Sequence, residues 1–569
     1  MIRSRLMGLA TAAIAFILAP VMADVPPAMD RVPADAAIVI SVKNIGKLKA
    51  GIESLAKALN IPAEDMEAMM KVGEVMKMQG ADPEGSAAVG VMGVDGEDAD
   101  AVAIIPVRDY GAFVKNFGGT GAGVDELKLD EKPIYVKNLD GGFAAVGPKK
   151  DLVEKFGGKP GNGKSHEALM GVTGKAIAES CDVVVVANIA KLSDKIKEGT
   201  QQFKDQMAMG MAMMGNAGDL SGVDKFMDSF LRDATAGILG FRVGESGVTF
   251  DAGAQFREGS ELAGYLTSKG KAAGLLSMLP DQPFLFAMAM DSSGPGMQKL
   301  MKDLKAFGQK MQGGEGKEGV AGMFPTDWAE KSDGFAFQIG TSPAPVGGLF
   351  LNTVAYMKTA KPADMAKNMK DTITGMNGKT MDGVSFTTTY EEGVAAGSQK
   401  ADAWSIKMQA DPENPQADML NQVNFMLFGP GGLGGYAVPT DGGMVLTYSK
   451  NSDLLAQAVA SAKGGANMGT EAEVKKIAAA LPADRSFEGY IGVKSLLDTA
   501  LGVLGPAGIA PNVQVPDEIP PVGMGMTTHG GGFRMTLVVP TKVMTSIKTM
   551  VDSMDQGDGE KPDAGQPKF

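Results

Sequence analysis

The chain has few of the residues on which the commonest metal and nucleophile chemistries depend. Its 569 residues include one cysteine, Cys181, and two histidines, His166 and His529. These numbers argue against a zinc site built on several His or Cys ligands and rule out an intramolecular disulfide. Two tryptophans and eight tyrosines leave little for the aromatic platforms that bind sugars or single-stranded nucleic acid. We therefore predict no cofactor, no metal site and no catalytic residue.

Cys181 stands just before the apolar run at residues 183–186. The position suggests a small apolar residue at the start of a strand. An intermolecular disulfide is the alternative interpretation.

Positive charge and long apolar runs are also scarce. Lys and Arg number 54 against 67 Asp and Glu, which gives a net charge of −13. This balance disfavours phosphate backbones and anionic lipid surfaces as partners. After the first 23 residues no uninterrupted apolar stretch reaches the roughly 18 residues that a membrane-spanning helix needs. We expect no nucleic-acid partner and no transmembrane segment in the mature chain.

The first 23 residues have the three parts of a cleavable signal peptide. Arg3 and Arg5 form a positive start, residues 6–19 an apolar core, and residues 20–23 (PVMA) a helix breaker followed by a small-residue cleavage site. We predict cleavage after about Ala23 and a soluble mature chain that is periplasmic or secreted. Loss of two arginines leaves 52 basic and 67 acidic residues, a net charge of −15.

A seven-residue segment occurs twice, each time between an apolar run and a helical pattern. Residues 42–48 (VKNIGKL) and 186–192 (VANIAKL) are identical at five of seven positions. Each copy passes from a β-rich run through Asn, which suits a helix N-cap, to apolar residues at helical spacing. A third opening at 481–484 (LPAD) echoes 32–35 (VPAD), and a fourth, weaker one begins at Leu279.

The order of segments around these openings predicts two similar halves. A strand with a short helix, a Gly-Gly strand with a helix, and a closing hairpin followed by a helix recur in that order. The hairpins are expected at 237–256 and 522–539. The corresponding domains are a signal peptide at 1–23, a first half at 24–278, a second half at 279–554 and a disordered tail at 555–569.

Short strands, Gly-rich turns and intervening helices without strict βαβ alternation predict the fold class α+β. Each half is expected to hold a largely antiparallel sheet, amphipathic helices and short hairpins. Parallel pairing is the alternative. Residues 313–322 and 429–435 are expected to be loops or a connection between the halves.

Residues 158–165 (GKPGNGKS) match the phosphate-binding loop pattern G-x-x-x-x-G-K-[ST]. That loop works only where a buried strand leads directly into it, so that backbone N–H groups converge on phosphates. Here the preceding residues, 151–156, have the pattern of a helix. The matching stretch of the second half, 464–470 (GGANMGT), lacks the Gly-Lys pair. We therefore predict a flexible linker with Ser165 as the N-cap of the next helix.

Residues 529–532 (HGGG) resemble the oxyanion loop of lipases and esterases, but no G-x-S-x-G nucleophile occurs in the chain. A hairpin turn is the better interpretation. His166-Glu167 begins a zinc-protease pattern in which Met170 stands where the second His is required.

Methionine is abundant, with 40 residues in the chain. Five of them, Met207, Met209, Met211, Met213 and Met214, crowd into one segment whose thioethers could ligate Cu(I). The alternative is that Met takes the place of Leu on helix faces throughout the chain.

At the repeat openings the chain resembles exported bacterial proteins that are assigned only to domains of unknown function. The residues that carry the likeness are the V-P-A-D-A opening at 32–36, the segment 105–110 and the Gly-Gly-Phe-Ala-Ala-Val strand at 141–146. The resemblance implies an envelope or secreted context and no activity.

Our leading hypothesis is a non-enzymatic binding or structural protein of the cell envelope, with a protein or other envelope component as partner. One alternative is an envelope hydrolase that uses carboxylates on its loops. Another is a small-molecule or peptide carrier with a pocket between the halves.

Overall fold

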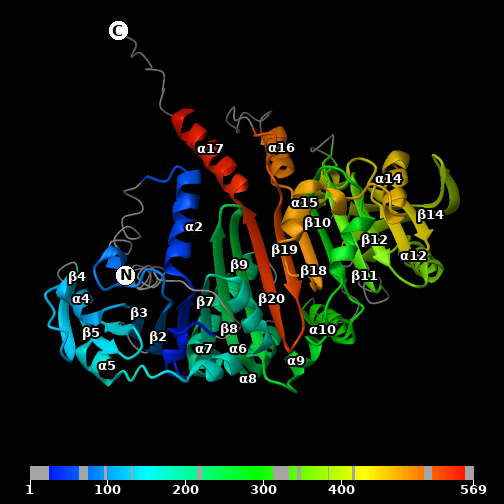
Figure 1. Cartoon of the computed structure of the whole chain (residues 1–569). Helices are drawn as coiled ribbons and strands as arrows, with labels where there is room; N and C mark the ends of the chain where they lie inside the picture. The colour runs from blue at the N-terminus through cyan, green and yellow to red at the C-terminus, as the bar shows by residue number, and fades with distance from the viewer. Residues whose placement is uncertain are drawn as a thin grey trace, which may run out of the picture. The chain divides into compact units, whose positions relative to one another are not determined.

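The computed structural model describes residues 25–62, 75–94, 99–129, 132–213, 221–311, 332–342, 348–381, 383–412, 417–504 and 515–557. These residues form two compact units. Unit 1 runs up to Thr267 and also includes Thr528–Thr536, whereas unit 2 comprises Ser268–Thr527 and the residues from Leu537 onward. The predicted signal peptide and the end of the expected tail, 558–569, lie outside the described residues. Figure 1 shows the elements along the chain.

Unit 1 contains one antiparallel sheet with the strand order β4-β5-β6-β3-β2-β1-β7-β8-β9. Its strands are β1 (Ile38–Val42), β2 (Ala87–Gly93), β3 (Asp100–Pro106), β4 (Val124–Leu129), β5 (Lys132–Leu139), β6 (Phe143–Gly147), β7 (Val183–Asn188), β8 (Ala234–Gly244) and β9 (Gly247–Phe256). The last strand of the chain, β20 (Gly532–Pro540), lies beside β9 and contributes its residues up to Thr536 to this unit.

Unit 2 contains an antiparallel sheet with the order β13-β14-β15-β16-β17-β12-β11-β10-β18-β19. Its strands are β10 (Phe284–Asp291), β11 (Gly334–Gly340), β12 (Thr353–Lys358), β13 (Thr380–Met381), β14 (Val384–Ala396), β15 (Gln399–Ala410), β16 (Leu433–Thr440), β17 (Gly443–Thr447), β18 (Phe487–Ile491) and β19 (Val522–Thr527).

The opening strand of each unit occupies the same place in its sheet. β1 lies between β2 and β7, and β10 lies between β11 and β18. From there the order continues in one direction through β3, β6 and β5 in unit 1 and through β12, β17 and β16 in unit 2. The prediction of an α+β fold with largely antiparallel sheets is therefore confirmed, and the alternative of parallel pairing is wrong for every pair with an assigned register. The two similar halves stay a prediction, with which this shared strand order agrees.

Helices cover these sheets. Unit 1 contains η1 (Met29–Arg31), α2 (Ile45–Ala58), α4 (Tyr110–Lys115), α5 (Lys150–Lys155), α6 (Gly163–Ser180), α7 (Ile189–Met213), α8 (Ser221–Asp233) and α9 (Glu261–Tyr265). Unit 2 contains η3 (Ala272–Gly274), η4 (Leu276–Met278), α10 (Pro295–Met311), α12 (Pro362–Met376), α13 (Ala417–Phe428), α14 (Ser452–Ala462), η6 (Met468–Thr470), α15 (Ala472–Ala478), α16 (Val493–Leu504) and α17 (Thr541–Gly557). No helix in the described ranges is long and apolar enough to cross a membrane.

The repeat openings fold as their residues predict. Asn44 is extended and its side chain accepts a hydrogen bond from the backbone N–H of Lys47 at 2.6 Å, which caps α2. The second copy likewise passes from β7 into α7, which begins at Ile189. The strands of both predicted hairpins are present. β8 pairs with β9 across Gly244–Gly247, and β19 is followed by β20.

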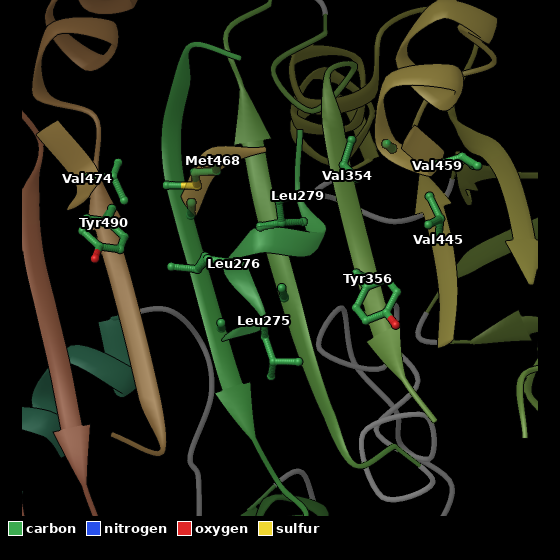
Figure 2. Packing of buried hydrophobic residues seen from close by; sticks show 14 of the residues in the cluster. Leu275, Leu276, Leu279, Val354, Tyr356, Val445, Val459, Met468, Val474 and Tyr490 are labelled. Atoms are coloured by element: carbon green, nitrogen blue, oxygen red, sulfur yellow. The ribbon is translucent and has the colours of Figure 1, made fainter. Parts of the chain in front are cut away.

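The main core of unit 2 lies on one face of its sheet (Figure 2). Ala287 and Ala289 of β10 and Tyr490 of β18 face it from the strands. Helical segments cover them, with Leu275, Leu276 and Leu279 close to the strands in the figure. Burial of such side chains contributes about 1.5–3 kcal/mol each. Unit 1 has a comparable cluster that includes Val39, Val102 and Ile238.

Three predictions of local structure are wrong. β16 begins at Leu433, so only the first part of the expected loop 429–435 lacks regular structure. α17 continues to Gly557, so the first residues of the expected disordered tail are helical. Ser165 does not cap a helix, because α6 begins at Gly163 with Asn162 at the cap position. The expected loop at 313–322 lies outside the described residues.

Candidate functional site

The segment that matches a phosphate-binding loop is occupied by a carboxylate of the protein itself. Asp30 accepts the backbone N–H of Gly161 through Oδ2 at 2.9 Å and that of Gly163 through Oδ1 at 2.6 Å. The element before the loop is the helix α5, not a strand. The amides at the start of α6 therefore hold an anion, but that anion is Asp30, which lies 131 residues from Gly161 in the sequence.

The two histidines lie in different segments of unit 1. His166 is buried at 1% exposure, and its Nε2 lies 2.9 Å from the backbone oxygen of Val32, to which it donates. His529 lies in the turn between β19 and β20. In this turn Gln255 Nε2 donates to the carbonyl of Gly530 at 3.0 Å, and Gly531 donates its N–H to Leu266. The Gly531 amide therefore bonds within the protein, as the hairpin interpretation predicts.

Cys181 lies at the carboxyl end of α6, two residues before β7, and is 1% exposed. Its thiol donates to Oδ2 of Asp251 at 3.0 Å. Burial, and then the neighbouring Asp251, raise the pKa of this thiol to about 12. A neutral thiol is a poor nucleophile and a poor metal ligand. The sequence predicts a small apolar residue at the start of a strand. Cys181 is buried, but it ends α6 rather than opening β7, and its thiol bonds to a carboxylate.

Asp251 is the centre of a buried polar cluster in unit 1. Arg534 donates through Nε at 2.7 Å and through Nη2 at 3.0 Å, and Thr536 donates its hydroxyl to Oδ1. The side chain of Asp251 has 0% exposure and that of Arg534 has 12%. With its hydrogen bonds made inside the fold, the cluster ties β20 to β9 and α6.

Metal ligands do not converge in the part of the chain that the structure describes, where no group of three or more His, Cys, Asp or Glu is placed to hold an ion. Of the methionine-rich segment, Met209 lies in α7 with a side chain 65% exposed. The structure does not describe the side chains of Met207, Met211 and Met213, nor any part of Met214. The Cu(I) hypothesis stays a prediction.

The best candidate site is a groove at one end of the sheet of unit 2, which we call the acidic groove. It has a volume of about 640 Å³. Its walls are the turn before β10, the start of α15, the start of α16, the segment before β19 and the start of α17. The lining residues are Asp281, Gln282, Pro283, Phe284, Glu471, Ala472, Glu473, Gly492, Lys494, Ser495, Asp517, Glu518, Ile519, Pro520, Pro521 and Lys542.

Five carboxylates and two amines line this groove, so its net charge is negative. Both amines are paired, Lys542 with Glu518 at 2.6 Å and Lys494 with Asp498 at 2.7 Å. Lys542 also lowers the pKa of Glu518. Asp281 and Asp517 are exposed, and neither forms an ion pair with any described residue. The groove thus presents unneutralised negative charge to a ligand.

A second cavity of about 400 Å³ adjoins the first and shares Pro283, Lys494 and Ser495 with it. It extends the site along α16 to Asp498 and Thr499 and across to Thr341 and Ser342, just after β11. Gly492 allows the start of α16 to lie against β10, where the two cavities meet. A Cβ at this position would lie 1.9 Å from the backbone oxygen of Phe284, so only glycine lets α16 start this close to β10.

Sequence reasoning did not find this groove, because its residues come from five separate segments. The only signals were Leu279-Pro280-Asp281, which stood out as a repeat opening, and the proline pair at 520–521. Neither carries chemistry by itself. The carboxylates become a site only through the fold.

No protein-family model matches the chain, and no curated protein matches it. Among solved structures, two crystal forms of TP0453, IV and III, are similar to part of it, each at 11% sequence identity. The matches cover 41% and 42% of this chain and 81% and 82% of TP0453, with TM-scores of 0.22 and 0.21. Likeness at this level carries no argument about fold or function.

Proposed function

We propose that the protein is an exported, non-enzymatic binding protein of the cell envelope that holds a positively charged ligand in the acidic groove of unit 2. The observation that carries the proposal is a cavity of about 640 Å³, within the range of small-molecule sites, with unpaired carboxylates at Asp281 and Asp517. Export rests on the signal-peptide pattern of residues 1–23.

The groups that first suggested chemistry are engaged within the fold, which favours the non-enzymatic alternative. His166, Cys181 and the Gly161–Gly163 amides each bond to another part of the fold. Among the groove carboxyls, Glu518 has a pKa lowered by Lys542, whereas a general acid needs a raised one.

A thermal-shift screen tests the proposal. The mature protein is heated with polyamines, lysine-rich peptides, long-chain amines, fatty acids, sugars and nucleotides. We expect cations to raise the melting temperature and the double variant Asp281→Asn, Asp517→Asn to lose the effect. Stabilisation by none of the cations would contradict the proposal.

The alternative function, a hydrolase that uses carboxylates, is tested by an activity assay with substitutions in the same groove. We expect no turnover of ester, peptide, glycosidic or phosphate substrates. Turnover that one groove substitution abolishes without loss of folding would replace the binding role with catalysis.

A further inference from the structure

Four neighbouring strands of the unit 2 sheet, β10, β11, β18 and β19, carry apolar side chains on the face opposite the core. An antiparallel sheet with one face on a core commonly presents polar residues on the other, in strict alternation. β10, β11, β18 and β19 depart from this rule. Ala287 and Ala289 face the core, and the residues that alternate with them, Phe286, Met288 and Met290, are also apolar.

On the face opposite the core, the strand register aligns the residues of β19, β18, β10 and β11 in three rows. The first row is Val522, Ile491, Phe286 and Ile339. The second is Met524, Gly489, Met288 and Phe337. The third is Met526, Phe487, Met290 and Phe335. We call these twelve residues the Met/Phe face. It contains no polar or charged side chain, and apart from buried Gly489 its residues are all partly exposed.

Gly489, near the middle of this face, is covered by its neighbours. A Cβ there would meet Cγ of Met524 at 3.0 Å and Cζ of Phe487 at 3.2 Å, so these two side chains extend over the glycine and make the apolar surface continuous. Methionine side chains adapt to apolar ligands of varied shape. Successive rows lie about 7 Å apart, and the face therefore offers an apolar track roughly 14 Å long.

The acidic groove lies at one end of this track. The first row ends where the groove begins, since Gly492 follows Ile491, Pro521 precedes Val522, and Phe284 opens β10. The second cavity reaches Thr341 and Ser342, just beyond the last strand of the row. Negative charge and apolar surface are thus arranged in sequence along the strands.

We infer that the ligand is a single-chain amphiphile with a cationic head, whose amine or quaternary ammonium group lies in the acidic groove and whose apolar chain lies along the Met/Phe face. The inference rests on the proposed function and specifies its ligand. An anionic amphiphile would fit the apolar track equally well, but its head would meet the carboxylates of Asp281 and Asp517.

Calorimetric titration of the mature protein tests this assignment with three probes kept below their micelle concentrations. Decylamine has head and chain, decanoate has the same chain with the opposite charge, and butylamine has the head with little chain. We expect decylamine to bind about tenfold more tightly than either of the others at low salt, and the advantage over decanoate to shrink in high salt.

Two pairs of substitutions separate the contributions of head and chain. The double variant Asp281→Asn, Asp517→Asn should bind decylamine about tenfold more weakly than the parent protein and decanoate no more weakly. The control variant Asp364→Asn, Asp441→Asn, changed at exposed sites of the same unit, should bind both ligands as the parent does. The double variant Met288→Gln, Met524→Gln should bind decylamine more weakly than the parent protein and butylamine equally well. These Met sites are partly exposed, so circular dichroism should show a folded protein.

The outcomes distinguish the two proposals. If decanoate binds as tightly as decylamine, or if the methionine substitutions leave decylamine unchanged, the amphiphile assignment is overturned and a binding role remains. If neither the three probes nor any cation of the thermal screen binds, the groove is not a ligand site and both proposals fall.

Discussion

Arg534 and Asp251 form a two-point ion pair, with Nε donating to Oδ1 at 2.7 Å and Nη2 to Oδ2 at 3.0 Å. The two residues lie 283 positions apart in the sequence. The pair fastens the last strand of the chain to β9 of unit 1. Because the carboxylate is fully buried, the stability of unit 1 depends on residues near the carboxyl end of the chain.

Replacement of Arg534 by Met should therefore destabilise unit 1 strongly. A buried carboxylate that loses its cation costs about 3–5 kcal/mol. Urea unfolding followed by circular dichroism measures the loss. Arg242→Met is the control, because Arg242 is partly buried and makes one 3.2 Å hydrogen bond, to Thr249, so it should cost about 1 kcal/mol or less. Equal losses in the two variants would contradict this role of Arg534.

Cys181 should not react with iodoacetamide in the folded protein at neutral pH. Its pKa is raised from 9.0 to about 12, first by burial and then by Asp251, so almost no thiolate forms. Mass spectrometry of protein labelled with and without urea checks this. Modification of the folded protein at the rate of the unfolded one would show that the thiol is accessible.

The same shift predicts how stability depends on alkaline pH. The folded state holds the thiol proton more tightly than the unfolded state. The contribution of the thiol is therefore complete below about pH 9 and declines as pH rises toward 12. A Cys181→Ala variant should lose less of its stability over this interval than the parent protein. Parallel unfolding curves for the two proteins from pH 9 upward would contradict the shift.

Asp30→Ala should destabilise unit 1 by about 1–2 kcal/mol, because the amides of Gly161 and Gly163 lose their acceptor. Lys164→Ala, at the exposed Lys of the same pattern, should change stability by less than about 0.5 kcal/mol. Neither variant nor the parent should bind ATP in equilibrium dialysis. ATP binding by the parent that Lys164→Ala removes would restore the nucleotide hypothesis.

The exported protein should begin at about Asp24. Intact-mass measurement of protein collected from the periplasm or medium of an expressing cell gives its amino terminus. Ala28, Met29 and Val32 are buried in unit 1, so the processed chain needs this segment intact. A product that retains residues 1–23, or that stays in the cytoplasm, would contradict export.

The elements that sequence alone could predict are those with local causes. Asn44 caps α2 through its own side chain, and the Gly244–Gly247 turn joins two strands that are adjacent in the chain. Residue type and spacing suffice for such features. The sheet could be assigned as antiparallel from its short strands and turns, although its strand order could not.

The features that escaped prediction depend on long-range contacts. α6 begins at Gly163, two residues before Ser165, and the Gly163 amide finds its acceptor in Asp30 of a distant segment. The Met/Phe face appeared in the sequence only as abundant methionine. Its rows exist because register sets Met288 opposite Phe337 and Gly489. No local pattern encodes that alignment.

Methyl NMR of the methionines tests the central claim most directly. With ¹³C-methyl methionine in the mature protein and decylamine added, the resonances of Met288, Met290, Met524 and Met526 should shift together and saturate. Those of Met365 and Met369, buried in another cluster of unit 2, should stay in place. No shift on the Met/Phe face, or equal shifts in the Asp281→Asn, Asp517→Asn variant at the same concentration, would contradict a cationic amphiphile held between groove and face.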